Sequence, residues 1–375
     1  MPPDEPQIGA ASIELIRLWI AQGAAKDRAQ AKKLAAERAA ARAEAAANAV
    51  APSAARVAVM PEGWPTIDKH LPERPGPLRA VALSPTAPLI AVPGVAQVLL
   101  LHAGDLHELG LLDFPFGTVE QLAFDAAGAR LLVAGGRAGR EGAAVLFDVR
   151  SGRELGRFAL QADAVLAAAL SPSGELVAAG GTRRRLEVFD VAAGELRWRA
   201  EHDEWVVAAA FSPDGASIAS ADRSGRIIVR EALSGRELHA LSGHEGGVTA
   251  LAFSPDSSLL VSGGVDRRVR AFRMRDGSQA WSQRGHRDDV LCLAWESPKQ
   301  LVSGGADGAL LHWQADGGRA PALPALGEWV YDLAVSSDGS QLVTADWSGR
   351  LAVVALESRK LVTSCVPLGI AESPD

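Results

Sequence analysis

The chain has few of the residues that metal-bound and disulfide-linked proteins use: among 375 residues there are two cysteines, Cys292 and Cys365, and no Cys-x-x-Cys pair. Neither a zinc ribbon nor a covalent haem attachment site is therefore encoded in these residues. Cys292 lies in the apolar run from Val290 to Ala294, so we interpret it as a buried free thiol that packs as a small hydrophobe.

Excess positive charge and long apolar runs are also absent. The formal net charge is −7, which argues against a non-specific nucleic-acid binder, because such a protein needs a basic face that releases phosphate counterions. Glu14 and Arg17 interrupt the one early apolar stretch, so we expect no membrane span and no signal peptide. Cytoplasm is then the default location.

What the chain does have is a repeat. An apolar strand, a Ser-Pro-Asp-Gly-like turn and two further strands recur, and the same alanine position returns about every 40 to 46 residues, at Ala82, Ala123, Ala169, Ala210, Ala252, Ala294 and Ala334. A period of this length is typical of propeller blades with four strands each. The sequence therefore predicts an all-β, seven-bladed β-propeller over residues 78–366.

Each inner strand alternates, with alanine where the strands of neighbouring blades converge on the axis. A larger side chain there would overpack the hub at a cost of about 1 to 3 kcal/mol, which is our explanation for alanine in all seven repeats. Each blade is continuous in sequence, and whether residues near 56–60 add a closing strand is left open.

The residues before the propeller have a different composition. Residues 8–24 place Ile13, Ile16 and Trp19 on one stripe, which predicts an amphipathic helix within residues 1–24. Residues 25–77 are first Ala-rich and then Pro-rich, which is typical of a helical spacer followed by a linker. Residues 367–375 form a C-terminal tail.

The repeat resembles the WD-repeat family of propellers. Gly243-His244 and Gly285-His286 stand where that family has Gly-His, and Phe147-Asp148 stands where it has Trp-Asp. The resemblance implies a hydrogen-bonded network, and the matching positions are His286, Ser303, Asp307 and Trp313 in repeat six, and His244, Ser262 and Asp266 in repeat five. Repeat five has Phe272 in place of the tryptophan. Repeat four keeps His202 and Ser220 but has Ser224 and Arg230 at the other two positions.

A serine, a histidine and an aspartate close together also fit a catalytic triad. A nucleophile must be exposed beside an oxyanion hole, whereas the network would lie between strands, so we interpret it as structural. His102, His107, His239 and His312 are scattered without metal-ligand spacing, so we expect no metal site. No cofactor is expected.

The mouth of the propeller, which we define as the face with the loops before the inner strands and the turns between second and third strands, is the expected binding surface. Trp205 and Trp329 share one register there, and Trp347 lies in the turn of repeat seven. Exposed aromatics are typical binding anchors, although neighbouring loops can also half-cover them. Arg183, Arg184 and Arg185 either pair with nearby acids or capture an acidic peptide or phosphate.

The N-terminus is similar to the end of the small c-type cytochrome domain that precedes WD-repeat propellers in planctomycete-type bacterial proteins. The resemblance rests on MPPDEPQIGAASIELIRLWIAQGA, and it implies that Met1 corresponds to an axial haem ligand. The Cys-x-x-Cys-His of that family is missing. One hypothesis is that the chain is the back part of a longer, exported, periplasmic protein; the alternative is an unrelated helix that docks on the propeller or on a partner.

We therefore expect a monomeric, non-enzymatic scaffold that binds a protein partner through the mouth. The alternative function is an accessory docking domain of a c-type cytochrome electron-transfer protein whose haem module is absent from this chain. An enzyme acting at the central channel would need clustered acids, bases or metal ligands on the inner strands, and those positions are mostly Ala, Val and Leu.

Overall fold

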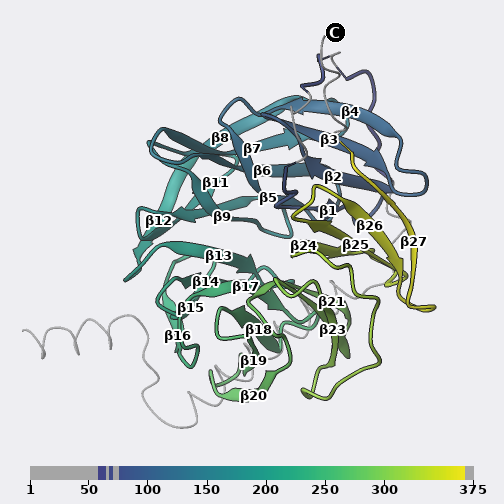
Figure 1. The fold of residues 1–375 in the computed structure, drawn as a ribbon. Helices are drawn as coiled ribbons and strands as arrows, with labels where there is room; N and C mark the ends of the chain where they lie inside the picture. The colour runs from purple at the N-terminus through teal and green to yellow at the C-terminus, as the bar shows by residue number, and fades with distance from the viewer. Residues whose placement is uncertain (1–57, 65–66, 71–75, 368–375) are drawn as a thin grey trace, which may run out of the picture. The chain divides into compact units, whose positions relative to one another are not determined.

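Seven antiparallel sheets are arranged in a ring with their first strands at the centre (Figure 1). The computed structural model describes residues 58–64, 67–70 and 76–367. The predicted helix over 8–24, the spacer that follows it and most of the C-terminal tail lie outside these described residues. The sequence-predicted seven-bladed, all-β propeller is confirmed.

Each blade is built from consecutive strands, and every neighbouring pair within a blade is antiparallel. Blades 1 to 3 contain β1 (Ala82–Leu83), β2 (Leu89–Pro93), β3 (Gln97–His102), β4 (Glu108–Asp113), β5 (Thr118–Phe124), β6 (Arg130–Arg137), β7 (Glu141–Asp148), β8 (Glu154–Gln161), β9 (Val165–Leu170), β10 (Leu176–Gly181), β11 (Arg185–Asp190) and β12 (Glu195–Glu201). Blades 4 to 7 contain β13 (Val206–Phe211), β14 (Ser217–Asp222), β15 (Ile227–Glu231), β16 (Glu237–Leu241), β17 (Val248–Phe253), β18 (Leu259–Gly264), β19 (Arg268–Arg273), β20 (Gln279–Arg284), β21 (Val290–Ser297), β22 (Gln300–Gly305), β23 (Leu310–Gln314), β24 (Val330–Val335), β25 (Gln341–Asp346), β26 (Leu351–Ala355) and β27 (Lys360–Cys365).

Blade 6 departs from the expected four strands. Its sheet contains β21, β22 and β23, and the outer position is taken by a loop that makes a single bridge between Trp313 and Arg319. Pro321 and Pro324 lie in this loop. Because proline cannot donate a hydrogen bond to a ladder, this segment does not continue as a fourth strand.

Apolar clusters between neighbouring blades hold the ring together. One of them joins blades 7 and 1 and includes Leu78, Ile90, Val343 and Leu351, all at most 1% exposed. The amide of Leu78 donates to the carbonyl of Asp346 at 3.0 Å, and the amide of Val81 donates to the Asp332 carboxylate at 2.8 Å. In the described chain the ring therefore closes through side-chain packing and hydrogen bonds between blades, since residues 58–60 form no strand.

The expectation of a closely packed hub is wrong at several repeats. Ala82 and Ala169 are buried, but the other five repeat alanines keep partial exposure, namely Ala123, Ala210, Ala252, Ala294 and Ala334. Larger residues also occur two positions earlier on the inner strands, such as Cys292 and Asp332. Overpacking at the axis therefore does not explain alanine in all seven repeats.

A tryptophan from the segment before the propeller completes the outer edge of blade 1. Its outer strand β4 has Gly110 opposite Leu100, at the register where blades 3 and 5 have Trp198 and Trp281. Trp64 fills that place, and a Cβ added to Gly110 would lie 2.5 Å from its ring. The purple segment in Figure 1 lies beside β4.

The hydrogen bond of Trp64 repeats the same pattern. Its indole Nε1 donates to the carbonyl of Val149 in blade 2 at 3.0 Å, just as Trp198 donates to Ala232 and Trp281 to Ala315, each at 2.8 Å. Part of the stretch that the sequence assigns to a linker therefore connects blades 1 and 2 as the outer-strand tryptophans connect other neighbouring blades.

Candidate binding surface

The hydrogen-bonded network of blade 6 joins four side chains that the resemblance singled out. His286 Nδ1 lies 2.9 Å from Asp307 Oδ1, and His286 Nε2 lies 2.7 Å from Ser303 Oγ. The Trp313 indole donates to the same Ser303 oxygen at 2.8 Å. His286, Ser303 and Trp313 are at most 3% exposed, so this network ties the loop before β21 to β22 and β23.

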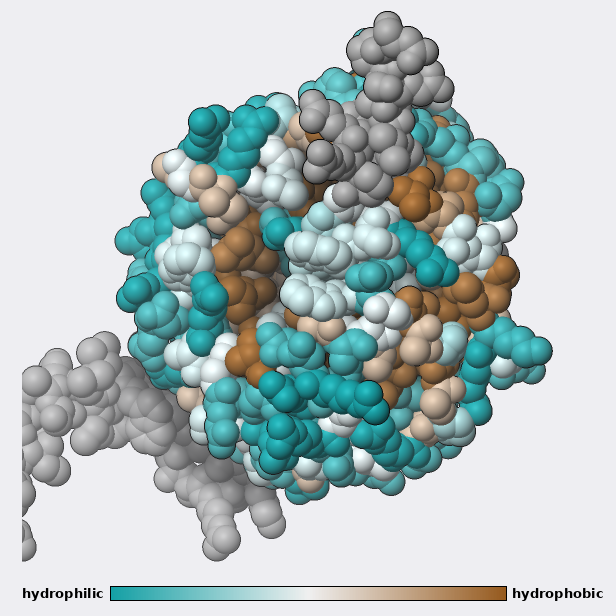
Figure 2. Space-filling view, viewed as in Figure 1, coloured by the Kyte–Doolittle hydropathy of each residue, from teal (hydrophilic) through white to brown (hydrophobic). Residues whose placement is uncertain are grey.

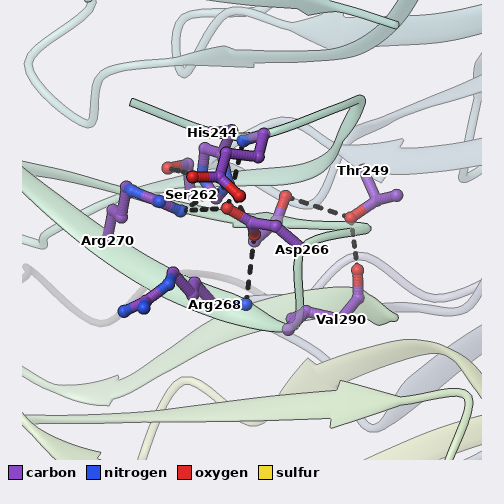
Figure 3. Close-up of polar contacts among 9 residues, drawn as sticks. His244, Thr249, Ser262, Asp266, Arg268, Arg270 and Val290 are labelled. Carbon is purple, nitrogen blue, oxygen red and sulfur yellow. Dashed lines mark hydrogen bonds and ion pairs between the residues drawn. The ribbon is translucent and has the colours of Figure 1, made fainter. Parts of the chain in front are cut away.

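Blade 5 compensates for its missing tryptophan with an arginine that the sequence analysis did not identify. His244 contacts Asp266 at 3.0 Å and Ser262 at 2.8 Å. Arg270 Nη1 lies 2.6 Å from Asp266 Oδ2 and 2.8 Å from His244 Nδ1 (Figure 3). Thr249 donates to the Val290 carbonyl of the next blade, so this region also links blades 5 and 6.

Blade 4 forms its network with a different aspartate. His202 lies 2.9 Å from Ser220 Oγ and 3.1 Å from Asp222 Oδ2. Ser224, which stands at the motif position of the aspartate, donates its hydroxyl to Asp222 Oδ1 at 2.5 Å. The carboxylate therefore comes from the end of β14, two residues before the position that the motif marks.

Burial keeps these histidines from acting as exposed bases. Removal from water lowers the pKa of His202, His244 and His286 below the ordinary histidine value, although each contacts a carboxylate. In His202 and His286, a neutral ring donates from Nδ1 to the aspartate and accepts from the serine hydroxyl at Nε2. Since each serine is fully buried and cannot meet a substrate, the geometry agrees with a structural role.

The mouth residues Trp205 and Trp329 share one backbone register. The Trp205 carbonyl accepts from the Arg223 amide at 3.1 Å, and the Trp329 carbonyl accepts from the Trp347 amide at 3.0 Å. In both blades the turn between second and third strands thus lies beside the loop before the first strand. Trp205, Trp329 and Trp347 are 36%, 45% and 48% exposed.

An aromatic cluster, formed by Trp329, Tyr331 and Trp347, occupies the mouth at blade 7. The ring centroids of Trp329 and Trp347 are 5.3 Å apart, and Tyr331 lies 5.9 Å from Trp347. The guanidinium of Arg79, from blade 1, lies 5.9 Å from the Tyr331 ring centre. Tyr331 is the chain's one tyrosine, and the sequence analysis did not include it or Arg79.

A pocket of about 450 Å³ continues the mouth from this cluster. Its lining comes from residues 76–79, residues 93–96 and residues 117–119, together with Arg137. Arg79 borders both the pocket and the Tyr331 ring. The pocket and the aromatic cluster are therefore neighbours on the mouth at blades 7, 1 and 2.

Most mouth charges near the predicted residues have internal partners. Arg184 lies 3.5 Å from Glu204, and Arg185 lies 2.9 Å from Glu187. Arg183 is exposed, and no carboxylate of the described chain is within ion-pair distance of it. Arg223 lies 5.0 Å above the Trp205 ring, so Trp205 is partly covered. Figure 2 shows hydrophilic and hydrophobic residues interspersed around one face of the ring.

The histidines outside the networks are less scattered than expected. His102 and His107 come together with Asp105 in one turn. His239 Nε2 donates to the carbonyl oxygen of Met274 at 2.9 Å, and buried His312 lies 2.6 Å from Glu296. The first pair is therefore not scattered, because a turn brings together residues that no familiar spacing marks. The absence of a metal site stays a prediction.

Comparison with known proteins supports the fold and part of the repeat. Residues 196–230, 235–273 and 277–314 match the family model described as "WD domain, G-beta repeat". No curated protein matches the chain. A crystal structure of the computationally designed Ika8 protein is similar with a TM-score of 0.63 and 22% identity, covering 79% of this chain and 89% of that one, which shows the fold alone.

The comparisons do not support the cytochrome resemblance of the N-terminus, whose residues lie outside the described chain. Within the described residues, no helix has the length and apolar character needed to cross a bilayer. The three matched segments together with the seven-bladed ring support a WD-repeat β-propeller.

Proposed function

We propose that the protein is a non-enzymatic interaction scaffold that binds a protein partner at its mouth, with the aromatic cluster of blade 7 as the centre of the binding surface. The observation that carries this proposal is the exposure of Trp329 and Trp347, at 45% and 48%, beside Tyr331. Aromatic anchors of this kind carry much of the binding energy in protein interfaces.

The surroundings of the cluster favour this surface over the one at Trp205. The adjoining pocket of about 450 Å³ offers a concave surface for a partner side chain. By contrast, Arg223 lies over the Trp205 ring. Trp205 and the arginines at 183–185 are therefore proposed as the edge of the surface, where paired charges contribute about 0 to 1 kcal/mol each.

The experiment compares capture by the full chain and by two variants that lie on different faces. The mouth variant is Trp329→Ala with Trp347→Ala. The control is Leu233→Ser, which removes a 61% exposed apolar side chain in the turn between β15 and β16, away from the mouth. Cross-linked partners from a lysate of the source organism are quantified by mass spectrometry.

We expect at least one partner to be captured by the wild type and by Leu233→Ser but reduced about tenfold or more by the mouth variant, since each anchor contributes about 1 kcal/mol or more. Equal capture by the mouth variant and the wild type would show that the partner binds at another surface. Loss in the control alone would place it on the opposite face.

A further inference from the structure

The turn between β3 and β4 in blade 1 brings two histidines and an aspartate together. Nδ1 of His102 lies 2.9 Å from Oδ1 of Asp105, and Nδ1 of His107 lies 2.6 Å from the same oxygen. The two imidazole rings stack with their centroids 5.1 Å apart. The ligand atoms of all three residues lie within 4.8 Å of one another, at the end of the hairpin away from the mouth.

The backbone of this turn has the same conformation as the equivalent turn of blade 2, whereas its side chains differ. The His102 amide donates to the His107 carbonyl at 2.9 Å, as the Asp148 amide does to Arg153 in blade 2. Leu106 has a φ of 61° where blade 2 has Gly152 with a φ of 68°. A frame that other blades also use therefore holds the two histidines and the aspartate in blade 1.

We propose that His102, Asp105 and His107 bind a divalent transition-metal ion of the Zn²⁺ type. Two imidazole nitrogens and one carboxylate oxygen are a ligand set that Zn²⁺ and its neighbours accept, whereas Ca²⁺ and Mg²⁺ prefer oxygen ligands. With three protein ligands, the fourth position of a tetrahedral site is open to water.

The side chains need only small movements to reach this geometry. Bonds of about 2.0 to 2.2 Å around a tetrahedral ion separate neighbouring ligand atoms by roughly 3.3 Å, compared with the present 2.9 and 2.6 Å between the imidazole nitrogens and the Asp105 oxygen. The carboxylate of Asp105 needs to move outward by less than about 1 Å to reach these separations. Its side chain is 63% exposed, so solvent leaves room for this movement.

Calorimetric titration of the full chain with ZnCl₂, after removal of any affinity tag, tests the site. The variant is His102→Gln with His107→Gln, and the matched control is His70→Gln, which changes an exposed histidine before the propeller. We expect about one equivalent of Zn²⁺ to bind to the wild type and to the control, with affinity at least about tenfold weaker in the double variant. Equal affinity in the double variant, or no binding to the wild type, overturns the proposal.

A second measurement identifies the ligand atoms and does not depend on the double variant. In ¹⁵N-labelled protein, Zn²⁺ should shift the Nδ1 resonances of His102 and His107, and Asp105→Asn should weaken binding while leaving the turn bonds of the backbone in place. Coordination through Nε2 atoms, or through histidines elsewhere in the chain, contradicts the site. Because this turn and the aromatic cluster are on different faces, either proposal can fail without the other.

Discussion

Blades 4 to 6 and blade 7 differ in how the loop before the inner strand is held in place. In blade 6 a buried histidine joins the loop before the inner strand to Ser303 and Asp307. Blade 7 has Leu326 in the place of that histidine; its amide donates to the Gly308 carbonyl, as the amide of His202 donates to the Arg184 carbonyl in blade 4. The backbone of the blade therefore keeps the same hydrogen bond without the histidine.

The two regions also differ in what they present at the mouth. Blade 7 keeps Asp346 buried, where it accepts bonds from the backbone and hydroxyl of Ser348, and exposes aromatic rings above this turn. In blades 5 and 6, the positions that correspond to Asp346 and Trp347 have glycine followed by valine or alanine. The histidine network is the main polar feature of these two blades. We infer that blades 4 to 6 contribute most to rigidity and that blade 7 with blades 1 and 2 contributes most to recognition.

The largest expected effect is in blade 6. Trp313→Ala removes a side chain that is 1% exposed and leaves the Ser303 hydroxyl without its indole donor, so we expect the free energy of unfolding to fall by about 3 to 5 kcal/mol. Urea unfolding followed by circular dichroism measures it. A loss below about 1 kcal/mol would mean that the network contributes little to rigidity.

The next effect tests which residue completes the network of blade 4. Asp222→Ala removes the carboxylate that contacts His202, and we expect a loss of about 3 kcal/mol, because the buried partners are left unpaired. Ser224→Ala is the control and should cost about 1 kcal/mol. A larger loss of stability in Ser224→Ala than in Asp222→Ala would show that Ser224, at the motif position, completes the network.

Trp64→Ala tests the connection between blades 1 and 2. The variant loses packing on Gly110 and the indole hydrogen bond to Val149, and we expect about 2 kcal/mol less stability together with faster proteolysis within residues 58–64. Trp64→Phe keeps part of the packing, so its stability should lie between that of the wild type and that of Trp64→Ala. Unchanged proteolysis would show that this segment does not stabilise the ring.

The ring closure at blades 7 and 1 should depend on pH through Asp332. Burial raises the pKa of Asp332 to about 7, so the folded state binds this proton more tightly than the unfolded chain does. The stabilising contribution is therefore present below about pH 4 and is lost as the pH rises to about 7.

Asp332→Asn removes this titration while keeping an oxygen that accepts from the Val81 amide. As the pH rises from about 5 to about 8, the melting temperature of the wild type should fall relative to that of the variant. A difference in melting temperature that does not change with pH would show that Asp332 titrates normally.

The smallest expected effect on stability is at the mouth. Trp329→Ala and Trp347→Ala change side chains that are nearly half exposed, so each should alter the free energy of unfolding by about 0.5 kcal/mol or less. A loss similar to that of Trp313→Ala, in the same urea assay, would remove the difference between the two regions.

The period of the repeat was enough to predict the number of blades, because one alanine position recurs in every repeat and a strand hairpin forms from local residues. The motif also named His286, Ser303 and Trp313, which the structure brings together. It missed Arg270 and Asp222, since each enters its network from a position that the motif does not mark.

Contacts between distant segments were harder to predict. Trp64 bonds to Val149 across 85 positions, and no local pattern indicates that Gly110 leaves room for it. This contact depends on the register of whole blades, which a single repeat does not contain. His102 and His107 are close in sequence, but they meet because Leu106 adopts the left-handed conformation at a position where other blades have glycine.

Hydrogen exchange of the propeller with and without its captured partner locates the binding surface. We expect the partner to slow exchange at residues 327–331 and 345–349 and at residues 76–80, which surround the aromatic cluster and the adjoining pocket. Protection confined to the opposite face, such as residues 232–236, would contradict the assignment of recognition to blade 7 and its neighbours.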